Sequence, residues 1–250
     1  MNAAVWFSSL AGLAALAATP AGAQPSRVII LRHAEKLNAY ALCDLGRERA
    51  DALAKQFLGQ GATQSLFAPG ERPAAFMAVT LHPLETITPA AQTWGLPVID
   101  YSVVPNKDGD DDAAEAQINA RTQEAARDLM SSHEYDGKIV VIAWEHKHIA
   151  NHKLEKDYRG QEVTFRQLLR LGQAPESWPD TNYDYFWIVD YAPGNPNPVR
   201  FQAVKQTFTS PFNTIPAPDW DGPEPKHIEA VQEVAETLLV ANPIRVDLAM

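Results

Sequence analysis

The chain of 250 residues carries 31 acidic and 21 basic residues, which gives a formal net charge of −10 at pH 7. No basic block interrupts the sequence, and this excludes nucleic acid and anionic lipid as expected partners. Cys43 is the only cysteine, which excludes an internal disulfide.

The first 23 residues contain no Lys, Arg, Asp or Glu. Residues 5–18 are mostly apolar but too few to cross a bilayer comfortably, and Ala21-Gly22-Ala23 is similar to a signal-peptidase site. We therefore expect a signal peptide at 1–23, a single domain at 24–250 and a secreted or periplasmic protein. It would make no membrane contact after the signal is removed. An uncleaved membrane anchor or a poorly ordered tail is the alternative.

Apolar runs alternate with helical patterns through the next part of the chain. Residues 28–31 form an apolar run that predicts a buried strand, and Asp44 is the predicted N-cap of a helix at 45–58. Further strands are predicted at 75–81, 97–99 and 139–144, and further helices at 85–94 and 113–130. This alternation is typical of an α/β fold with a largely parallel sheet.

The pattern changes after Trp144. Residues 183–191 and 199–208 flank a turn rich in proline and glycine, which predicts an antiparallel hairpin added to the sheet. A proline-rich loop at 211–225 and a helix at 227–240 follow.

Polar side chains follow three of the predicted strands. Arg32 and His33 come after the first strand, and His82 after the second. Glu145 and His146 follow the strand at 139–144. Ligands of α/β sheets collect beyond the carboxyl ends of the strands, so we expect these side chains to share one edge.

Arginine together with histidines at one edge favours phosphoryl chemistry. An arginine fork binds oxyanions through two hydrogen bonds, and histidine can act as a nucleophile or as a second cationic group. Phosphoryl transfer needs charge neutralisation around the phosphoryl oxygens and an in-line nucleophile. Arg32, His33 and His146 would meet both needs without a metal.

Four segments follow one another along the chain: LRHAEK, LCDLGRERADALAKQF, LETITPAAQTWGLPV and VVIAWEHKHI. They resemble, in order and spacing, the motifs of the histidine phosphatase superfamily, the phosphoglycerate mutase-like proteins. The resemblance runs from about residue 27 to residue 149 and suggests an exported branch with an RHAEK signature. It implies a three-layer α/β/α sandwich whose mostly parallel sheet carries an added C-terminal antiparallel hairpin.

The resemblance also implies roles for individual residues. His33 would be the nucleophile that forms a phosphohistidine, Arg32 would bind phosphate, and His146 would bind the phosphoryl group in the transition state. The protein would be a metal-independent phosphomonoesterase that needs no cofactor and acts on a small phosphorylated substrate. A mutase is the alternative within the same family, and an exported location argues against it.

One position departs from the family pattern. The family's second phosphate-binding arginine lies four residues before a helix threonine, and counting back from Thr86 leads to His82. A neutral imidazole supplies one donor and no charge. His82 would be either a substitute that is protonated when phosphate binds or the mark of a weakened, anion-binding module.

The leaving group needs a proton donor, and two carboxylates are candidates. Glu145 adjoins His146, and Asp108 lies in the loop after the predicted strand at 97–99. The residues leave this choice open. Lys36 follows the signature closely and is a candidate phosphate ligand.

A metallohydrolase is a third class of function. The segment EHKHIANH offers His146, His148 and His152 as zinc ligands, although at most two of them would meet on one helix. Loss of activity with a chelator would support this class.

The sequence leaves the substrate and the oligomeric state open. Specificity in this fold comes from insertions around the phosphate pocket, here residues 107–116 and 151–184. Tyr158, Trp178 and Tyr183 in the second insertion either stack on a substrate ring or pack a lid.

Overall fold

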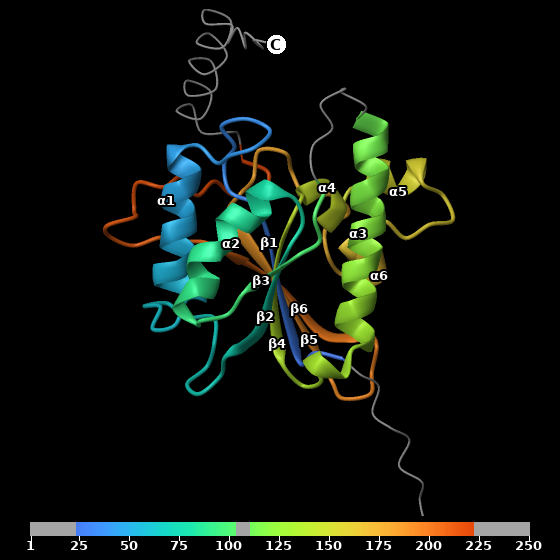
Figure 1. Cartoon of the computed structure of the whole chain (residues 1–250), viewed down its shortest axis with the longest axis horizontal. Coiled ribbons are helices and arrows are strands. Elements are labelled where there is room, and N and C mark those ends of the chain that lie inside the picture. Colours follow the sequence, from blue (N-terminus) through green and yellow to red (C-terminus); the bar gives the residue numbers. More distant parts are fainter. Residues whose placement is uncertain (1–23, 104–110, 223–250) are drawn as a thin grey trace, which may run out of the picture.

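The computed structural model describes residues 24–103 and 111–222 (Figure 1). The predicted signal peptide, Asp108 and the predicted helix at 227–240 lie outside these residues. The described part forms a six-stranded sheet in the order β3-β2-β4-β1-β5-β6. The strands are β1 (Arg27–Arg32), β2 (Pro73–Ala78), β3 (Val98–Asp100), β4 (Ile139–Trp144), β5 (Tyr185–Tyr191) and β6 (Pro198–Lys205).

The sheet is mostly parallel, as predicted. Strands β3, β2, β4 and β1 run parallel to their neighbours. Strand β5 pairs antiparallel with β1, and β6 pairs antiparallel with β5. The hairpin predicted after residue 183 is therefore present, and it extends the sheet beyond β1.

Helices cover both faces of the sheet. Side chains of β1 alternate between two cores: Val28 and Ile30 pack in one, Ile29 and Leu31 in the other. Figure 1 shows α1 and α2 on one side of the sheet and α3 on the other. The predicted three-layer α/β/α sandwich is confirmed. The helical elements are α1 (Asp44–Leu53), η1 (Ala54–Leu58), α2 (Leu81–Thr93), α3 (Asp111–Ser131), η2 (His133–Tyr135), α4 (His146–Ile149), α5 (His152–Asp157) and α6 (Phe165–Leu168).

The N-terminus of α1 differs from the prediction. Cys43, not Asp44, is the N-cap: its backbone is extended, and its Sγ accepts a hydrogen bond from the Gly46 amide at 3.5 Å. Asp44 is the first helical residue, where an acidic side chain interacts favourably with the positive end of the helix dipole. The last turn predicted as α-helix is the π-helical segment η1.

The junction between β2 and α2 also differs from the prediction. The strand ends at Ala78 and the helix begins at Leu81, so the strand predicted at 75–81 is too long and the helix predicted at 85–94 starts too late. Thr80 turns the chain with a φ of 58°, a conformation that only a few per cent of non-glycine residues adopt. Pro83 lies in the first helical turn, where the missing amide costs no helical hydrogen bond.

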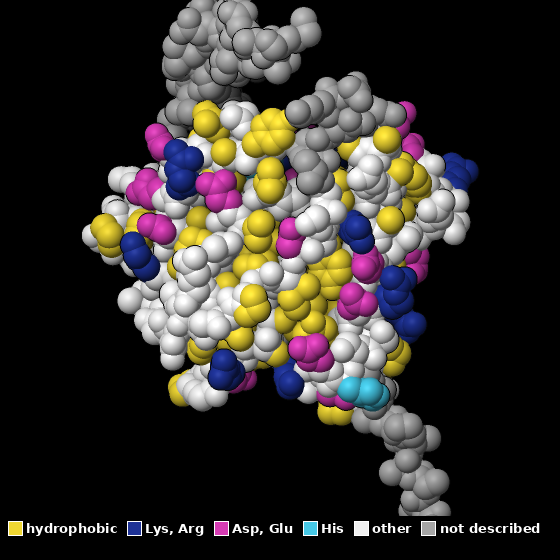
Figure 2. Space-filling model, viewed as in Figure 1, with side chains coloured by type: hydrophobic (Ala, Val, Ile, Leu, Met, Phe, Trp, Pro, Cys, Tyr) yellow, Lys and Arg dark blue, Asp and Glu magenta, His cyan; other side chains and the backbone are white. Residues whose placement is uncertain are grey.

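The surface seen in Figure 2 is mixed. Hydrophobic side chains gather along the middle of this face, between α2 and α3, and basic and acidic side chains are interspersed around them. Among the described residues, no helix is long and apolar enough to span a membrane.

Candidate functional site

The ends of two neighbouring strands bring the predicted site together. Arg32 ends β1 and lies in register with Trp144, the last residue of β4. The His33 amide donates to the Trp144 carbonyl at 3.1 Å, so the residues that follow the two strands start side by side. Glu145 and His146 leave β4 at this point, and His146 opens the short helix α4.

His82 reaches the same place by a different route from the one predicted. It lies in the first turn of α2, not at a strand end, and its ring centroid is 5.7 Å from that of His33. Thr86 Oγ1 accepts from the Ala34 amide at 2.8 Å and donates to the His82 carbonyl at 2.7 Å. This hydroxyl fastens the start of α2 to the loop that carries His33.

The His33 ring is buried and oriented by its own loop. Nδ1 donates to the Ala34 carbonyl at 2.6 Å, because a carbonyl oxygen only accepts. In the neutral ring this leaves the lone pair on Nε2, the atom that faces the site. Burial lowers the pKa of His33 to about 4, so the ring is neutral at neutral pH. A neutral imidazole with a free Nε2 lone pair is a nucleophile.

The guanidinium of Arg32 is held from two sides. Its Cζ lies 3.9 Å from the ring centroid of Tyr183. Its Nη1 donates to the carbonyls of Pro179, Asp180 and Asn182, at 3.2, 2.5 and 3.1 Å. These contacts fix the plane of the fork before any ligand arrives.

One ring nitrogen of His146 contacts a carboxylate, and the other has no hydrogen-bond partner among the described residues. Its Nε2 lies 2.6 Å from Asp180 Oδ1, and its ring centroid lies 6.3 Å from that of His33. Burial, followed by the nearby Arg32 charge, lowers the pKa of His146 to about 3. The ring is therefore neutral in the free protein at neutral pH.

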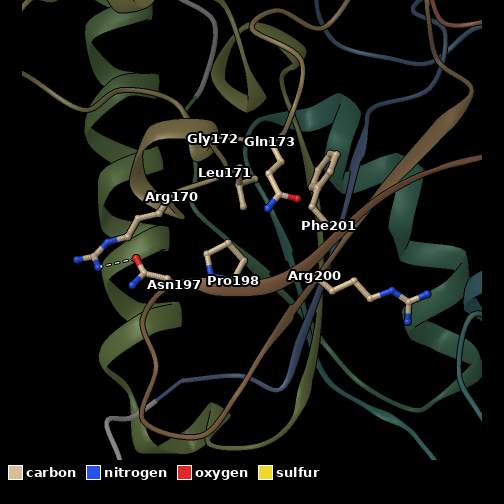
Figure 3. A pocket seen from close by; sticks show the side chains of 8 residues that line it. All are labelled: Arg170, Leu171, Gly172, Gln173, Asn197, Pro198, Arg200 and Phe201. Atoms are coloured by element: carbon tan, nitrogen blue, oxygen red, sulfur yellow. Dashed lines mark hydrogen bonds between the residues drawn. The ribbon is translucent and has the colours of Figure 1, made fainter.

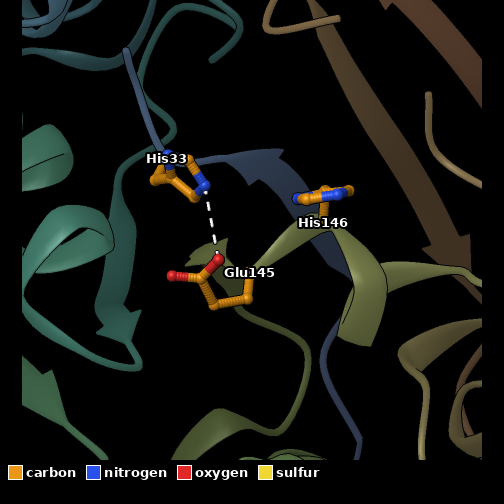
Figure 4. A group of neighbouring side chains, drawn as sticks. All are labelled: His33, Glu145 and His146. Carbon is orange, nitrogen blue, oxygen red and sulfur yellow. Dashed lines mark ion pairs between the residues drawn. The ribbon is translucent and has the colours of Figure 1, made fainter. Parts of the chain in front are cut away.

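Three buried nitrogens at this edge have no hydrogen-bond partner within the part of the chain that the structure describes. They are Arg32 Nε, His33 Nε2 and His146 Nδ1. Unpaired buried polar atoms cost free energy, and native proteins retain few of them. Figure 4 shows His33 and His146 near one another beside Glu145, with the His33 ring directed at the Glu145 carboxylate. Of these three atoms, Arg32 Nε is a hydrogen-bond donor as it stands, and an oxyanion beside it would accept its hydrogen bond.

Glu145 is the carboxylate of the site. Its Oε2 lies 3.3 Å from His33 Nε2, and its Oε1 accepts from Thr80 Oγ1 at 3.2 Å. Lys36 Nζ lies 3.3 Å from Oε2, so the predicted phosphate ligand Lys36 contacts Glu145 in this state. The pKa of Glu145 lies well below its ordinary value: burial acts against this shift, and contacts with His33, Lys36 and His146 outweigh it.

The remaining predicted residues divide into three groups. Asp108 lies outside the described residues. Tyr183 lies under Arg32, and Trp178 is a buried core residue whose Nε1 donates to the Asn182 carbonyl at 2.8 Å. Tyr158 is half-buried at the end of α5. Of the three aromatic residues, Tyr183 contacts the site directly.

The metal hypothesis can be compared with this geometry. Within the described residues, the one group of potential ligands close enough for an ion is His33, Glu145 and His146, whose ligand atoms lie within 4.8 Å of one another. The predicted trio of histidines at 146, 148 and 152 does not form: His148 bonds Asn119 in the core at 3.0 Å. Arg32 and Lys36 border the group, and their charges repel a cation.

Sequence reasoning missed the buried ion pairs that support the site. Arg49 of α1 binds Glu35 through Nε and Nη2, with its shortest contact at 2.6 Å, and binds Asp184 through Nη1 at 2.6 Å. All three side chains are at most 2% exposed. They join the loop after β1 to the start of β5. Glu35 lies two residues after His33 in the segment LRHAEK, so its charge was the feature of the sequence that could have indicated this ion pair.

Another cavity lies away from this edge (Figure 3). It measures about 200 Å³ and is lined by Arg170, Asn197, Arg200 and their neighbours. Arg170 donates to Asn197 Oδ1 at 3.1 Å. Figure 3 shows the Arg200 guanidinium directed away from the Arg170–Asn197 pair. None of the eight lining residues is a histidine, cysteine or carboxylate, so this cavity does not offer the same chemistry.

Comparisons with known proteins place these observations in context. None of the family models and none of the curated proteins compared with the chain matches it. Solved structures that resemble it include mycobacterial hydrolase 1, with 18% identity, 74% of this chain and 100% of that one covered, and a TM-score of 0.41.

Two further solved structures that resemble the chain are described as a phosphatase and a putative phosphatase. One is the mycobacterial glucosyl-3-phosphoglycerate phosphatase Rv2419c, with 14% identity, 74% and 100% coverage and a TM-score of 0.38. The other is the putative phosphohistidine phosphatase SixA from Agrobacterium tumefaciens, with 14% identity, 72% and 99% coverage and a TM-score of 0.35. These similarities are too low to indicate a function. The chain is an α/β protein in which Arg32, His33 and His146 cluster at the carboxyl edge of the sheet.

Proposed function

We propose that the protein is a metal-independent phosphomonoesterase that acts through a phosphohistidine on His33. The observation that carries the proposal is the group of three buried nitrogens, on Arg32, His33 and His146, that have no hydrogen-bond partner among the described residues and lie at the carboxyl ends of adjacent strands. A phosphoryl group satisfies all three, because it can accept from a guanidinium and an imidazolium and can bond covalently to Nε2.

The first step transfers the phosphoryl group to the protein. The Nε2 lone pair of His33 forms a bond to phosphorus while the bond between phosphorus and the ester oxygen breaks. Arg32 and His146 stabilise the charge on the phosphoryl oxygens during the transfer. In the second step a water oxygen bonds to phosphorus, the N–P bond breaks, and phosphate and neutral His33 are released.

Glu145 is the proton donor and acceptor in this proposal. The phosphoryl group occupies the space in front of His33 Nε2, where Glu145 Oε2 lies at 3.3 Å in the free protein, so the carboxylate moves aside when substrate binds. A neighbouring phosphate dianion raises the pKa of a carboxyl group. Glu145 then gives its proton to the leaving alkoxide and takes one from the attacking water.

Two other functions remain as outcomes of the test. An anion-binding module would keep the pocket without turnover, and the feature that favours it is His82, whose Nε2 donates to the Asn38 carbonyl at 2.7 Å. A metallohydrolase would use the group formed by His33, Glu145 and His146. We also propose that the enzyme acts on a small phosphorylated substrate outside the cytoplasm, after removal of the expected signal peptide at 1–23.

The test is hydrolysis of an aryl phosphate by residues 24–250 in the presence of a chelator. We expect turnover that survives the chelator and falls by roughly 10³-fold or more in His33→Ala, because the covalent step is lost. Phosphate binding without turnover would support the anion-binding module instead of the enzyme. Turnover lost on chelation and restored by a divalent cation would support the metallohydrolase.

A further inference from the structure

Asp180 contacts two residues of the proposed phosphate site, Arg32 and His146. It lies in the segment between α6 and β5, where its carboxylate meets His146 Nε2 at 2.6 Å and its main-chain carbonyl accepts from Arg32 at 2.5 Å. The His146 ring is buried, whereas the Asp180 side chain is 77% exposed. An exposed carboxylate thus contacts a buried ring of the site.

This contact decides which nitrogen of His146 carries a proton. An ionised carboxylate only accepts hydrogen bonds, so His146 Nε2 holds a proton and donates it to Asp180. In the neutral ring, Nδ1 then carries a lone pair. Nδ1 is the buried nitrogen without a partner in the described part of the chain. A lone pair cannot donate to a phosphoryl oxygen, so His146 can bind phosphate through Nδ1 only after it gains a second proton.

The charges around the proposed phosphate site explain why a second proton on His146 would favour phosphate binding. The groups that act on His146 are Arg32, His33, Glu145 and Asp180. Lys36 contacts Glu145, and His82 Nε2 is engaged with a backbone carbonyl. Among the described residues, Arg32 is therefore the one cation of the proposed phosphate site that no carboxylate contacts at ion-pair distance. A phosphate dianion needs a second positive charge nearby.

We infer that Asp180 is a positioning residue that fixes the tautomer of His146 and acts as its counter-ion when phosphate binding makes the ring an imidazolium. The inference rests on the proposed function for its substrate class, phosphomonoesters and phosphate. His146, with Asp180 behind it, takes over the charge that a second arginine would supply at position 82. A carboxylate that orients a histidine and stabilises its protonated form is an established device of enzyme sites.

The test is Asp180→Asn, with Asp219→Asn as the matched control. The asparagine Oδ1 still accepts from Nε2 but carries no charge. Asp219 is an exposed carboxylate that contacts Lys205, away from His146. We expect Asp180→Asn to weaken inorganic phosphate binding by roughly 10- to 100-fold, the loss typical of a charge-assisted hydrogen bond. Asp180→Glu should restore part of the affinity, and the control should bind as wild type does.

Nitrogen-15 NMR of the histidine rings, with saturating phosphate at neutral pH, separates this role from a purely structural one. We expect both nitrogens of His146 to be protonated in wild type, and Nδ1 to be unprotonated in Asp180→Asn. A loop that merely held Arg32 would lose affinity without changing the protonation of His146. Unchanged affinity in Asp180→Asn, or a wild-type His146 that stays neutral with phosphate bound, would overturn the inference.

These measurements do not depend on turnover. A protein that fails to hydrolyse phosphomonoesters but protonates His146 on binding phosphate, in a manner that needs Asp180, would refute the proposed enzyme and support the inference. Turnover through His33 with unaffected phosphate binding in Asp180→Asn would do the reverse.

Discussion

At the scale of single residues, two contacts at opposite ends of the His33 ring set its chemistry. The Ala34 carbonyl takes the Nδ1 proton at 2.6 Å, and Glu145 lies 3.3 Å from Nε2. The first contact follows from the loop directly after β1 and leaves the lone pair on Nε2, the reactive atom of the proposed mechanism. The second contact places a carboxylate where the proposed phosphoryl group would bind, so the proposed reaction requires Glu145 to move aside first.

The role of Glu145 can be tested through the leaving group. In Glu145→Gln we expect hydrolysis of an alkyl phosphate to fall by roughly 10²-fold or more, since general acid catalysis is typically worth 10²–10⁴-fold. Hydrolysis of a nitrophenyl phosphate should change far less, because its leaving group needs little protonation. The measurement is kcat/KM for both substrates. An equal loss for both would show that Glu145 is not the acid.

The clustering of these candidate residues at one edge of the sheet was predictable from the sequence, and their individual contacts were not. Arg32, His33, Glu145 and His146 follow apolar strands in the sequence, and the parallel pairing of β1 with β4 brings them together. Asp180 could not be found in this way. It belongs to an irregular segment whose position depends on hydrogen bonds to Arg32, which no local pattern reveals.

At the scale of elements, the buried Arg49 network connects the site loop to the hairpin. Glu35 follows the His33 loop and Asp184 precedes β5, and both carboxylates bind the guanidinium of Arg49 on α1. Coulombic attraction and hydrogen bonds from the two carboxylates outweigh burial and raise the pKa of Arg49. The Arg49 guanidinium therefore stays charged at any ordinary pH.

Breaking this network should be costly. Arg49→Met removes the cation and leaves two buried carboxylates, so we expect the free energy of unfolding to fall by about 3–5 kcal/mol. Arg121→Met is the control, because Arg121 forms an exposed pair with Glu124 and should cost less than about 1 kcal/mol. Urea unfolding measures both. Equal, small losses would show that the network contributes little to stability.

The junctions between elements were harder to predict than the elements themselves. The apolar run at 75–81 concealed the turn at Thr80, whose positive φ no propensity favours, so His82 was assigned to a strand end. Strand β4 was predicted with its observed bounds because charged or polar residues flank a continuous apolar run. Cys43 as a helix N-cap was missed because a thiol is a weak acceptor that propensity rules do not favour.

At the scale of the whole molecule, the histidines buried near the sheet edge make stability depend on pH. Burial lowers the pKa of His33 and His148 to about 4 and that of His146 to about 3. In the unfolded chain these groups titrate near 6.5. Below pH 6.5 the unfolded chain binds more protons than the folded one, so stability is present above that pH and is lost as pH falls towards 4.

A substitution at His148 tests this pH dependence of stability at a histidine that takes no part in the proposed reaction. In His148→Gln the amide can still donate to Asn119, but no proton uptake accompanies unfolding. We expect the loss of unfolding free energy between pH 7 and pH 4 to be smaller than in wild type by about 3 kcal/mol. His133→Gln, at an exposed position, is the control. Parallel pH profiles for wild type and His148→Gln would contradict this expectation.

The fold as a whole was predictable because its strongest signals are long. Four apolar runs separated by helical patterns predict a parallel sheet, and the turn rich in proline and glycine predicts the closing hairpin. The two cores on the sheet faces follow from alternation along buried strands. The three carbonyls that accept hydrogen bonds from Arg32 lie about 150 residues away along the chain, so these contacts could not be predicted from the sequence.

The covalent intermediate is the central claim, and the most direct measurement is to trap it. Residues 24–250 would be mixed with a nitrophenyl phosphate and quenched rapidly at alkaline pH, where phosphohistidine survives, and the modified peptide would be located by mass spectrometry. We predict a phosphoryl group on Nε2 of His33 that appears within one turnover and is absent from His33→Ala. Turnover without any phosphorylated protein, or a phosphoryl group on another residue, would contradict the account.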